Sequence, residues 1–183
     1  MQALKTGAIL ALLSVFSAFL LSFVHNAMSA KISQFRAEED FKMKASILPG
    51  ASIFEVSDEY GNETGFDSNN MEVGKIVHIT AEGYNGPIEL IAGIQKNGEI
   101  MGIKIIRHNE SLGTGSNIAG EGFVSQFKNT KTFQLFLKND NEKGIIDAIS
   151  GATVSSRNIV NAVREAAGSF VPKEKKENDA EEK

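Results

Sequence analysis

Hydroxyl-bearing and small residues gather in one short segment near the carboxyl end of the chain. The segment Ser150-Gly151-Ala152-Thr153-Val154-Ser155-Ser156 lies between a predicted strand, 144–149, and a predicted amphipathic helix that begins at Thr153. The first amides of a helix have no acceptor within it, and the helix dipole places partial positive charge there, so phosphates bind such ends. Two interpretations remain open from these residues alone: a phosphate site, or a helix cap in which one hydroxyl contributes about 1 kcal/mol.

Two familiar motifs for phosphate binding and nucleophilic catalysis do not match this segment. A Walker A loop needs Gly-Lys-Ser or Gly-Lys-Thr, which does not follow here. A hydrolase elbow, G-x-S-x-G, is excluded because Ser150 has Ala148 and Ala152 at the glycine positions. The sequence therefore predicts no catalytic residue.

The composition narrows the possible chemistry further. The chain has 183 residues and no cysteine, which excludes thiol nucleophiles, disulfides and iron–sulfur ligation. Its three histidines (His25, His78 and His108) lie far apart, without the spacing of a metal site. The net charge is -4 and there is no basic stripe, so a nucleic-acid partner is not expected. We predict no metal site, and any redox chemistry would come from an organic cofactor.

The amino-terminal segment reads as a membrane helix. No charged residue occurs between Lys5 and Lys31, and residues 7–24 are apolar or small. A spanning helix needs roughly 20 such residues, whereas the apolar core of a cleaved signal has about 7–15. We therefore predict a retained transmembrane helix over 1–30 rather than a signal peptide. The amino side carries Lys5, whereas the other side carries Lys31, Arg36, Lys42 and Lys44. The positive-inside rule read literally therefore does not favour an external domain, and charge alone leaves the orientation undecided.

The remaining chain predicts one domain of strands and helices. A helix over 31–48 should end at Pro49-Gly50, followed by a strand over 51–56, a polar loop over 58–70 and a strand over 74–81. Asn97-Gly98 between apolar runs predicts a hairpin of 88–95 with 99–106. In its second arm, alternation places Met101, Ile103 and Ile105 on one buried face.

The carboxyl half supplies the expected core helices. Phe123 and Phe127 are spaced for a short helix, and Phe133, Leu135 and Phe136 are predicted core residues. From Thr153 the apolar residues recur at helical spacing until Pro172. The charged segment 173–183 is predicted to be a solvated tail.

Three motifs resemble the FMN-binding domain family. Asp147-Ala148-Ile149-Ser150-Gly151-Ala152-Thr153 resembles its flavinylation motif, D-x-x-[ST]-G-A-T. The segment 108–115, HNESLGTG, is similar to its loop H-x-E-T-P-G-L-G; Ser111 replaces Thr, Leu112 replaces Pro and Thr114 replaces Leu. The segment 83–88, GYNGPI, resembles the family's entry into the hairpin. The likeness is greatest to the G subunits of Rnf-type electron-transport complexes, and the C subunit of the sodium-pumping NADH:quinone reductase is related.

The resemblance implies an α+β fold: a single transmembrane helix (1–30), a juxtamembrane helix (31–50), an FMN-binding domain (51–172) with an antiparallel sheet and packed helices, and the tail (173–183). In the family a flavin transferase joins FMN through its phosphate to the motif's last threonine, here Thr153. The implied cofactor contacts come from the two motifs, namely Ser150, Gly151, Ala152, Val154, Ser155 and Ser156, with His108, Glu110, Ser111, Leu112 and Gly113. We further predict that backbone amides of residues 152–155, with the hydroxyls of Ser155 and Ser156, hold phosphate oxygens, and that Gly113 and Gly115 admit the flavin ring.

The implied function is a one-electron relay in a membrane complex. The complex exchanges electrons between ferredoxin and NAD and couples this to ion transport, and the domain lies outside the cytoplasmic membrane. The implied partners are other subunits of the complex, the flavin transferase and the lipid bilayer. Two alternatives stay open: a subunit of the quinone-reducing pump, or a membrane-anchored anion-binding module without flavin.

Overall fold

The computed structural model describes residues 2–111, 113 and 115–170; within the first helix, the side chains at 2–6, 8, 9, 24, 26, 27, 29–31 and 33 are outside the described set. The chain divides into two compact units, Met1–Lys42 and Met43–Lys183. Helix α1 (Gln2–Ile47) runs through the first unit, and its last residues, 43–47, belong to the second.

The predicted membrane segment is helical along its described length. Among the described residues, however, no helix combines the length and the apolar character that crossing a bilayer requires. The predicted transmembrane helix over 1–30 is therefore not confirmed.

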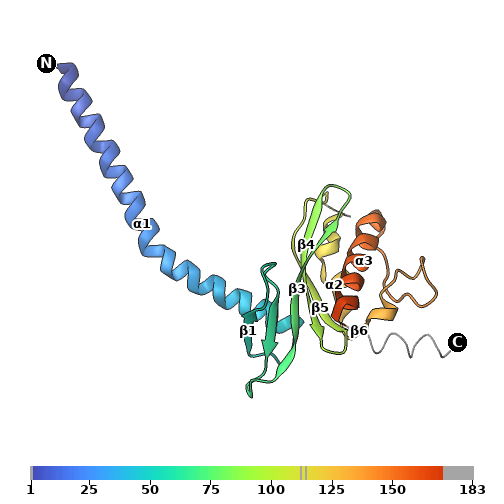
Figure 1. Ribbon diagram of the computed structural model, residues 1–183. Coiled ribbons are helices and arrows are strands. Elements are labelled where there is room, and N and C mark those ends of the chain that lie inside the picture. The colour runs from blue at the N-terminus through green and yellow to red at the C-terminus, as the bar shows by residue number, and fades with distance from the viewer. Residues whose placement is uncertain (1, 112, 114, 171–183) are drawn as a thin grey trace. The chain divides into compact units, whose positions relative to one another are not determined.

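The second unit is built on a six-stranded antiparallel sheet (Figure 1). Its strands follow one another in chain order, each paired with the next. They are β1 (Ile53–Val56), β2 (Glu63–Phe66), β3 (Glu72–Glu82), β4 (Pro87–Gln95), β5 (Glu99–Arg107) and β6 (Thr130–Lys131). This meander, with its helices, confirms the predicted α+β class.

Two predicted elements are wrong. The segment 58–70, predicted to be a loop, contains β2, because two aspartate turns bring this short polar stretch between β1 and β3. Asp58 Oδ1 accepts from the amides of residues 60 and 62, and Asp67 Oδ1 accepts from those of residues 69 and 71. The bond from the residue 71 amide also holds the pKa of Asp67 below its usual value. Where a strand over 144–149 was predicted, Leu137 and Ile146 form an isolated bridge instead.

The hairpin of β4 and β5 is confirmed, but one residue of β5, Met101, lies on the other face of the sheet from the one predicted. Gly98 takes a positive φ of 80° and its amide donates to Gln95 O at 2.9 Å. A β-bulge then places Met101 as the extra residue opposite the Gly93–Ile94 step. The bulge sends Met101 to the opposite face from Ile103. Simple alternation had placed the two on one face.

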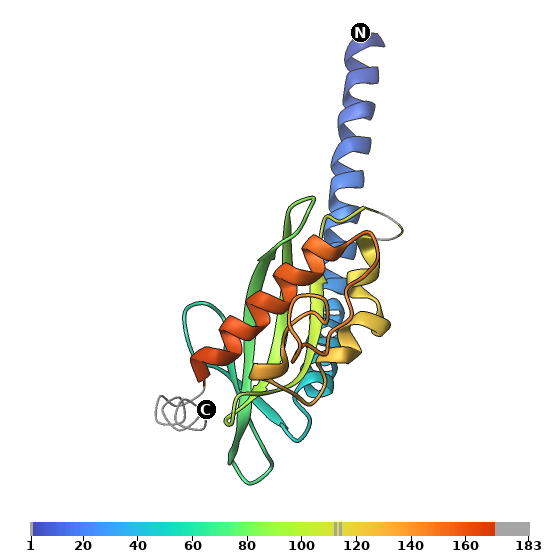
Figure 2. The ribbon, with the colours of Figure 1, turned by 90° about the vertical axis from the view of Figure 1, so that its right-hand side faces the viewer.

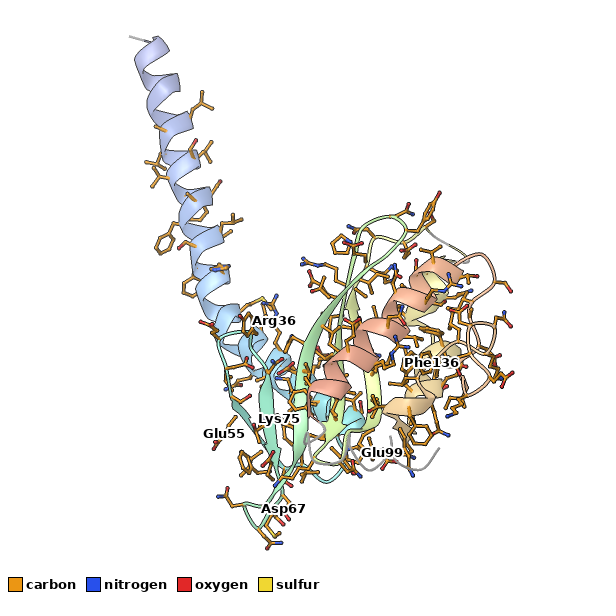
Figure 3. All side chains as sticks on the ribbon, turned by 45° about the vertical axis from the view of Figure 1, so that its right-hand side comes forward. Arg36, Glu55, Asp67, Lys75, Glu99 and Phe136 are labelled. Atoms are coloured by element: carbon orange, nitrogen blue, oxygen red, sulfur yellow. The ribbon has the colours of Figure 1, made fainter. Side chains whose placement is uncertain are left out.

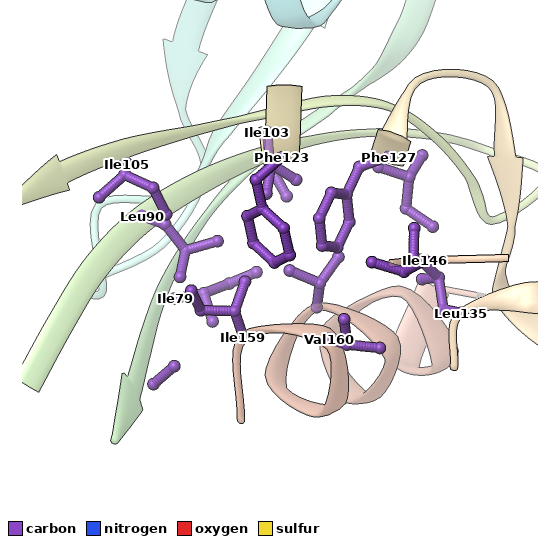
Figure 4. Close-up of a cluster of buried hydrophobic side chains, with 14 of the residues drawn as sticks. Ile79, Leu90, Ile103, Ile105, Phe123, Phe127, Leu135, Ile146, Ile159 and Val160 are labelled. Carbon is purple, nitrogen blue, oxygen red and sulfur yellow. The ribbon is translucent and has the colours of Figure 1, made fainter. Parts of the chain in front are cut away.

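Helix α3 (Thr153–Phe170) and the short helix α2 (Glu121–Val124) cover one face of the sheet (Figure 2). Figure 4 labels side chains of the apolar core that these helices share with the sheet; among them, Ile159 and Val160 belong to α3. Phe123 and Phe127 meet edge to face, with ring centroids 5.4 Å apart. Of the three core residues predicted nearby, Leu135 is fully buried and Phe136 is half-buried, whereas Phe133 is 58% exposed.

The end of α1 packs on the other face. Ile47, Leu48 and Ala51 form a second apolar cluster with Ile76 and Ile91. Close beside it, Lys44 Nζ lies 2.6 Å from Glu63 Oε1, and both side chains are only 12% exposed. The sheet is thus covered on both faces.

A glycine in β4 makes this second packing possible. A Cβ at Gly93 would overlap the carbonyl group of Ile47. We expect Gly93→Ala to lower the free energy of unfolding by about 1–3 kcal/mol, because the end of α1 must move off the sheet. Urea unfolding of the full chain in detergent, followed by circular dichroism, measures this change.

Gly168→Ala is the matched control. A Cβ at Gly168 meets nothing within 4 Å, and the site is helical, so this variant should be unchanged or gain about 0.5–1 kcal/mol. Equal stability of the two variants would contradict the close packing inferred at Gly93.

Candidate functional site

A cavity of about 390 Å³ lies at the amino-terminal end of α3. Its volume falls within the range of small-molecule sites. Three parts of the chain line it: the segment entering α3, the turn between β3 and β4, and the segment after β5. The lining residues are Tyr84, Glu110, Ser111, Gly115, Gly151, Ala152, Thr153, Val154 and Ser155.

Thr153 is the first residue of α3, and its side chain is exposed at the cavity. Gly151 takes a positive φ of 81°, which turns the chain into the helix. The Ala152 carbonyl accepts from the Ser156 amide at 2.9 Å and closes the first helical turn. The amides of residues 153–155 therefore have no acceptor within the helix, and this end of α3 favours an anion.

The next two hydroxyls point into the protein. Ser155 and Ser156 are fully buried. Ser156 Oγ donates to Ala152 O at 2.9 Å and accepts from the Ile149 amide at 3.2 Å. Ser155 Oγ donates to Glu110 Oε1 at 2.9 Å. These bonds fix the path of the chain into α3, and contact of the two hydroxyls with phosphate oxygens stays a prediction.

Glu110 joins the three parts of the cavity wall. One carboxylate oxygen, Oε1, accepts from the Tyr84 amide at 2.7 Å, the Asn85 amide at 3.5 Å and the Ser155 hydroxyl at 2.9 Å. The Tyr84 amide also donates to Ser155 Oγ at 3.2 Å. A hydrogen bond to a charged group contributes about 1.5–3 kcal/mol, so this oxygen holds the β3–β4 turn against α3.

Two glycines make room for the Glu110 side chain. A Cβ at Gly83 would overlap Glu110 Oε1, and a Cβ at Gly115 would lie 3.2 Å from the Glu110 Cβ. Asn85 Nδ2 adds a second link across the same gap, to Ser111 Oγ at 2.8 Å. Gly115 thus leaves room for Glu110, and it also lines the cavity, where its contact with the flavin ring stays a prediction.

The structure brings together only part of the predicted set. Of the residues named for cofactor contact, Glu110, Ser111, Gly151, Ala152, Thr153, Val154 and Ser155 line the cavity. Four others do not line it: His108, Gly113, Ser150 and Ser156. His108 Nδ1 instead accepts from the Glu110 amide at 3.3 Å. Leu112 lies outside the described residues. Tyr84 was missed, although the motif 83–88 contains it.

Two contacts fix α3 just beyond its first turn. Arg157 forms a two-bonded pair with Asp140, at 2.6 and 2.9 Å, and the guanidinium holds the pKa of that carboxyl below its usual value. Asn158 Nδ2 donates to Glu82 O, at the end of β3, at 2.7 Å. The end of α3 that carries Thr153 is therefore anchored to Asp140 and to the end of β3.

The arrangement is suited to holding a phosphorylated ligand. It combines an exposed hydroxyl, open helix amides and a cavity large enough for a small molecule. Over the part of the chain that the structure describes, no group of histidine, aspartate or glutamate side chains is placed to hold a metal ion.

Residues 83–168 match the FMN-binding domain family. The chain is 32% identical over 173 residues to the G subunit of the ion-translocating oxidoreductase complex of Methanosarcina acetivorans, covering 88% of this chain and 91% of that protein. It is 27% identical to the G subunit of the Na(+)-translocating ferredoxin:NAD(+) oxidoreductase complex of Acetobacterium woodii, covering 87% of each. The crystal structure of Shewanella oneidensis NqrC superposes with a TM-score of 0.49 at 21% identity, covering 69% of this chain and 68% of that one.

The hydrogen bonds of Glu110 predict a loss of stability when its carboxylate is removed. Glu110→Ala removes the acceptor shared by the β3–β4 turn and α3, so we expect the free energy of unfolding to fall by about 1–3 kcal/mol. Hydrogen exchange should speed up at the amides of residues 84 and 85, because both lose the Glu110 acceptor, although the Tyr84 amide keeps its longer bond to Ser155 Oγ.

Glu142→Ala serves as the control, because it removes a glutamate outside the cavity. It should leave the free energy of unfolding and the hydrogen exchange at residues 84 and 85 unchanged. Unaltered exchange at residues 84 and 85 in Glu110→Ala would contradict the linking role.

Proposed function

Because the chain belongs to the family of G subunits of ion-translocating oxidoreductase complexes, we propose that it carries FMN as a phosphate ester on Thr153 and relays single electrons within such a complex. The observation that carries this proposal is that Thr153, an exposed residue, begins α3 and lines the cavity. The Acetobacterium woodii relative is named as part of a ferredoxin:NAD(+) oxidoreductase, which supports electron transfer between those carriers.

The residues present fit an esterified FMN. The Thr153 hydroxyl would offer the attachment atom, and the amides of residues 153–155, at the amino-terminal end of α3, would favour the negative charge of the ester's phosphate. The FMN ring system supplies the electron chemistry when bound. The protein provides a fixed attachment point and an anion-favouring helix end. Glu110 and Ser155 hold the turn that carries Tyr84 against α3 by bonds within the protein.

A covalent tether suits a relay for a physical reason. An ester through the phosphate leaves the flavin ring unmodified by the protein, so non-covalent surroundings set its redox potential. It also prevents loss of the cofactor during repeated oxidation and reduction. We propose that a flavin transferase forms the ester and that the flavin-carrying domain spans 51–172.

We propose further that the segment 1–30 anchors the chain in the cytoplasmic membrane as a single pass, with the domain on the outer side. The support is the apolar run 7–24 of the sequence. Described apolar side chains within it are exposed on α1, namely Leu10, Leu12, Leu13, Val15, Phe16, Phe19, Leu20, Leu21 and Phe23. In this arrangement the partners are the lipid bilayer and the other subunits of the complex.

The ester on Thr153 is tested by intact mass. The full chain, purified from cells that contain the flavin transferase, should carry the mass of FMN less one water, mapped to the peptide with Thr153. Thr153→Ala should lose this mass and change the free energy of unfolding by less than about 0.5 kcal/mol, because the side chain is exposed.

Thr80→Ala, an exposed threonine on β3, should keep the added mass. Covalent flavin on the Thr153→Ala protein would assign the ester to another residue. An unmodified wild-type chain would favour the anion-binding module without flavin.

The membrane arrangement is tested with single cysteines, since the chain has none of its own. Ser68→Cys lies in the turn between β2 and β3, next to Asp67, which Figure 3 labels. A membrane-impermeant maleimide should label it in intact spheroplasts, and should label Gln2→Cys only after the membrane is permeabilised. The reverse pattern would place the domain in the cytoplasm, and extraction of the chain by alkaline carbonate would rule out a spanning helix.

A further inference from the structure

Tyr84 occupies the cavity wall without a role in attachment. It belongs to the motif 83–88, and its side chain is 78% exposed. Among the residues that line the cavity it is the aromatic one. The chain has two tyrosines and no tryptophan, so an easily oxidised aromatic ring occurs here and at Tyr60 alone.

The backbone of Tyr84 is held firmly although its ring is exposed. Its amide donates to Glu110 Oε1 at 2.7 Å and to Ser155 Oγ at 3.2 Å. The turn around it is closed by the Gly83 amide, which donates to Gly86 O at 2.9 Å, with Gly86 at a φ of 128°. The point from which the ring projects is therefore fixed relative to α3, which carries Thr153.

A second apolar side chain faces the same space. Val154 follows Thr153 in the first turn of α3, lines the cavity and is 49% exposed. Tyr84 and Val154 together leave apolar surface in contact with water beside the attachment hydroxyl. A flat aromatic ligand that covered this surface would gain both burial and ring stacking.

We propose that Tyr84 is the residue against which the flavin ring stacks, an inference that rests on the proposed FMN ester. With its phosphate end on Thr153, the flavin would have its ring within the same cavity, whose wall includes Tyr84. Stacking restricts the ring's motion and shields one of its faces from water. Tyr84 thereby contributes to the non-covalent surroundings that set the flavin's redox potential.

Stacking against Tyr84 should lower the fluorescence of the flavin. A tyrosine touching an excited flavin gives it one electron, and the electron then returns to the tyrosine, so the emission is lost and no net chemistry remains. Phenylalanine stacks equally well but is too hard to oxidise to act in this way. Replacing the hydroxyl-bearing ring thus separates stacking from electron donation.

The experiment uses detergent-solubilised full chains, co-expressed with the flavin transferase, with loading established first by intact mass. Tyr84→Phe should raise the fluorescence per bound flavin several-fold and leave the fluorescence anisotropy unchanged. Tyr84→Ala should raise the fluorescence, lower the anisotropy and weaken the visible circular dichroism of the flavin. The midpoint potential should shift in Tyr84→Ala.

Tyr60→Phe and Tyr60→Ala are the matched controls. Tyr60 is equally exposed, at 77%, but lies in the turn before β2, outside the cavity. Both should behave as the wild-type chain in every measurement. Wild-type fluorescence in Tyr84→Phe, together with wild-type anisotropy in Tyr84→Ala, would overturn the stacking role while the mass kept the ester intact. Absence of the added mass from the wild-type chain would instead overturn the proposed function and the stacking role with it.

Discussion

One carboxylate oxygen determines the shape of the candidate site. Glu110 Oε1 accepts hydrogen bonds from the β3–β4 turn and from α3, two segments that are far apart in sequence. A partly buried carboxylate is stable only when donors replace the water it has lost, and here two amides and one hydroxyl do so. Gly83 and Gly115 follow from the same constraint, because a Cβ at either position would press on the Glu110 side chain.

A second constraint acts on the opposite face of the sheet. The end of α1 approaches β4 so closely that Gly93 must lack a side chain, and Met101 reaches this face through the β-bulge. The Lys44–Glu63 pair lies at the edge of the same contact. Such a pair, removed from water, adds little net stability, but either charge left alone would be costly. It therefore favours one placement of the last turn of α1 over alternatives.

The sequence predicted the elements whose signals are local. The hairpin follows from Asn97-Gly98, and α3 follows from its apolar spacing. β2 was missed because it is short and polar and owes its existence to pairing on both sides. Ile146 sits in an apolar run that suggested a strand, but it is buried as a member of the apolar cluster that α3 and the sheet share. Neither case is decided by residues within the segment itself.

The candidate site divides in the same way. Thr153 was identified through a local motif, whereas the bond between Ser155 and Glu110 spans 45 residues of chain, which spacing in the sequence does not reveal. Tyr84 shows the same limit, since only the fold brings the turn between β3 and β4 to α3.

The flavinylation-like motif itself combines two physical tasks. At its beginning, the Asp147 amide donates to Gln126 Oε1 at 2.6 Å, and its carboxylate pairs with Lys138 at 2.6 Å. An exposed pair of this kind contributes at most about 1 kcal/mol, so its main effect is to fix the course of the chain. At its end, Gly151 and Ala152 turn the chain and leave Thr153 exposed on the first turn of α3. The first half of the motif is thus held by the scaffold, and the second half presents the hydroxyl, which explains why Asp147 and Ser150 can belong to the motif without lining the cavity.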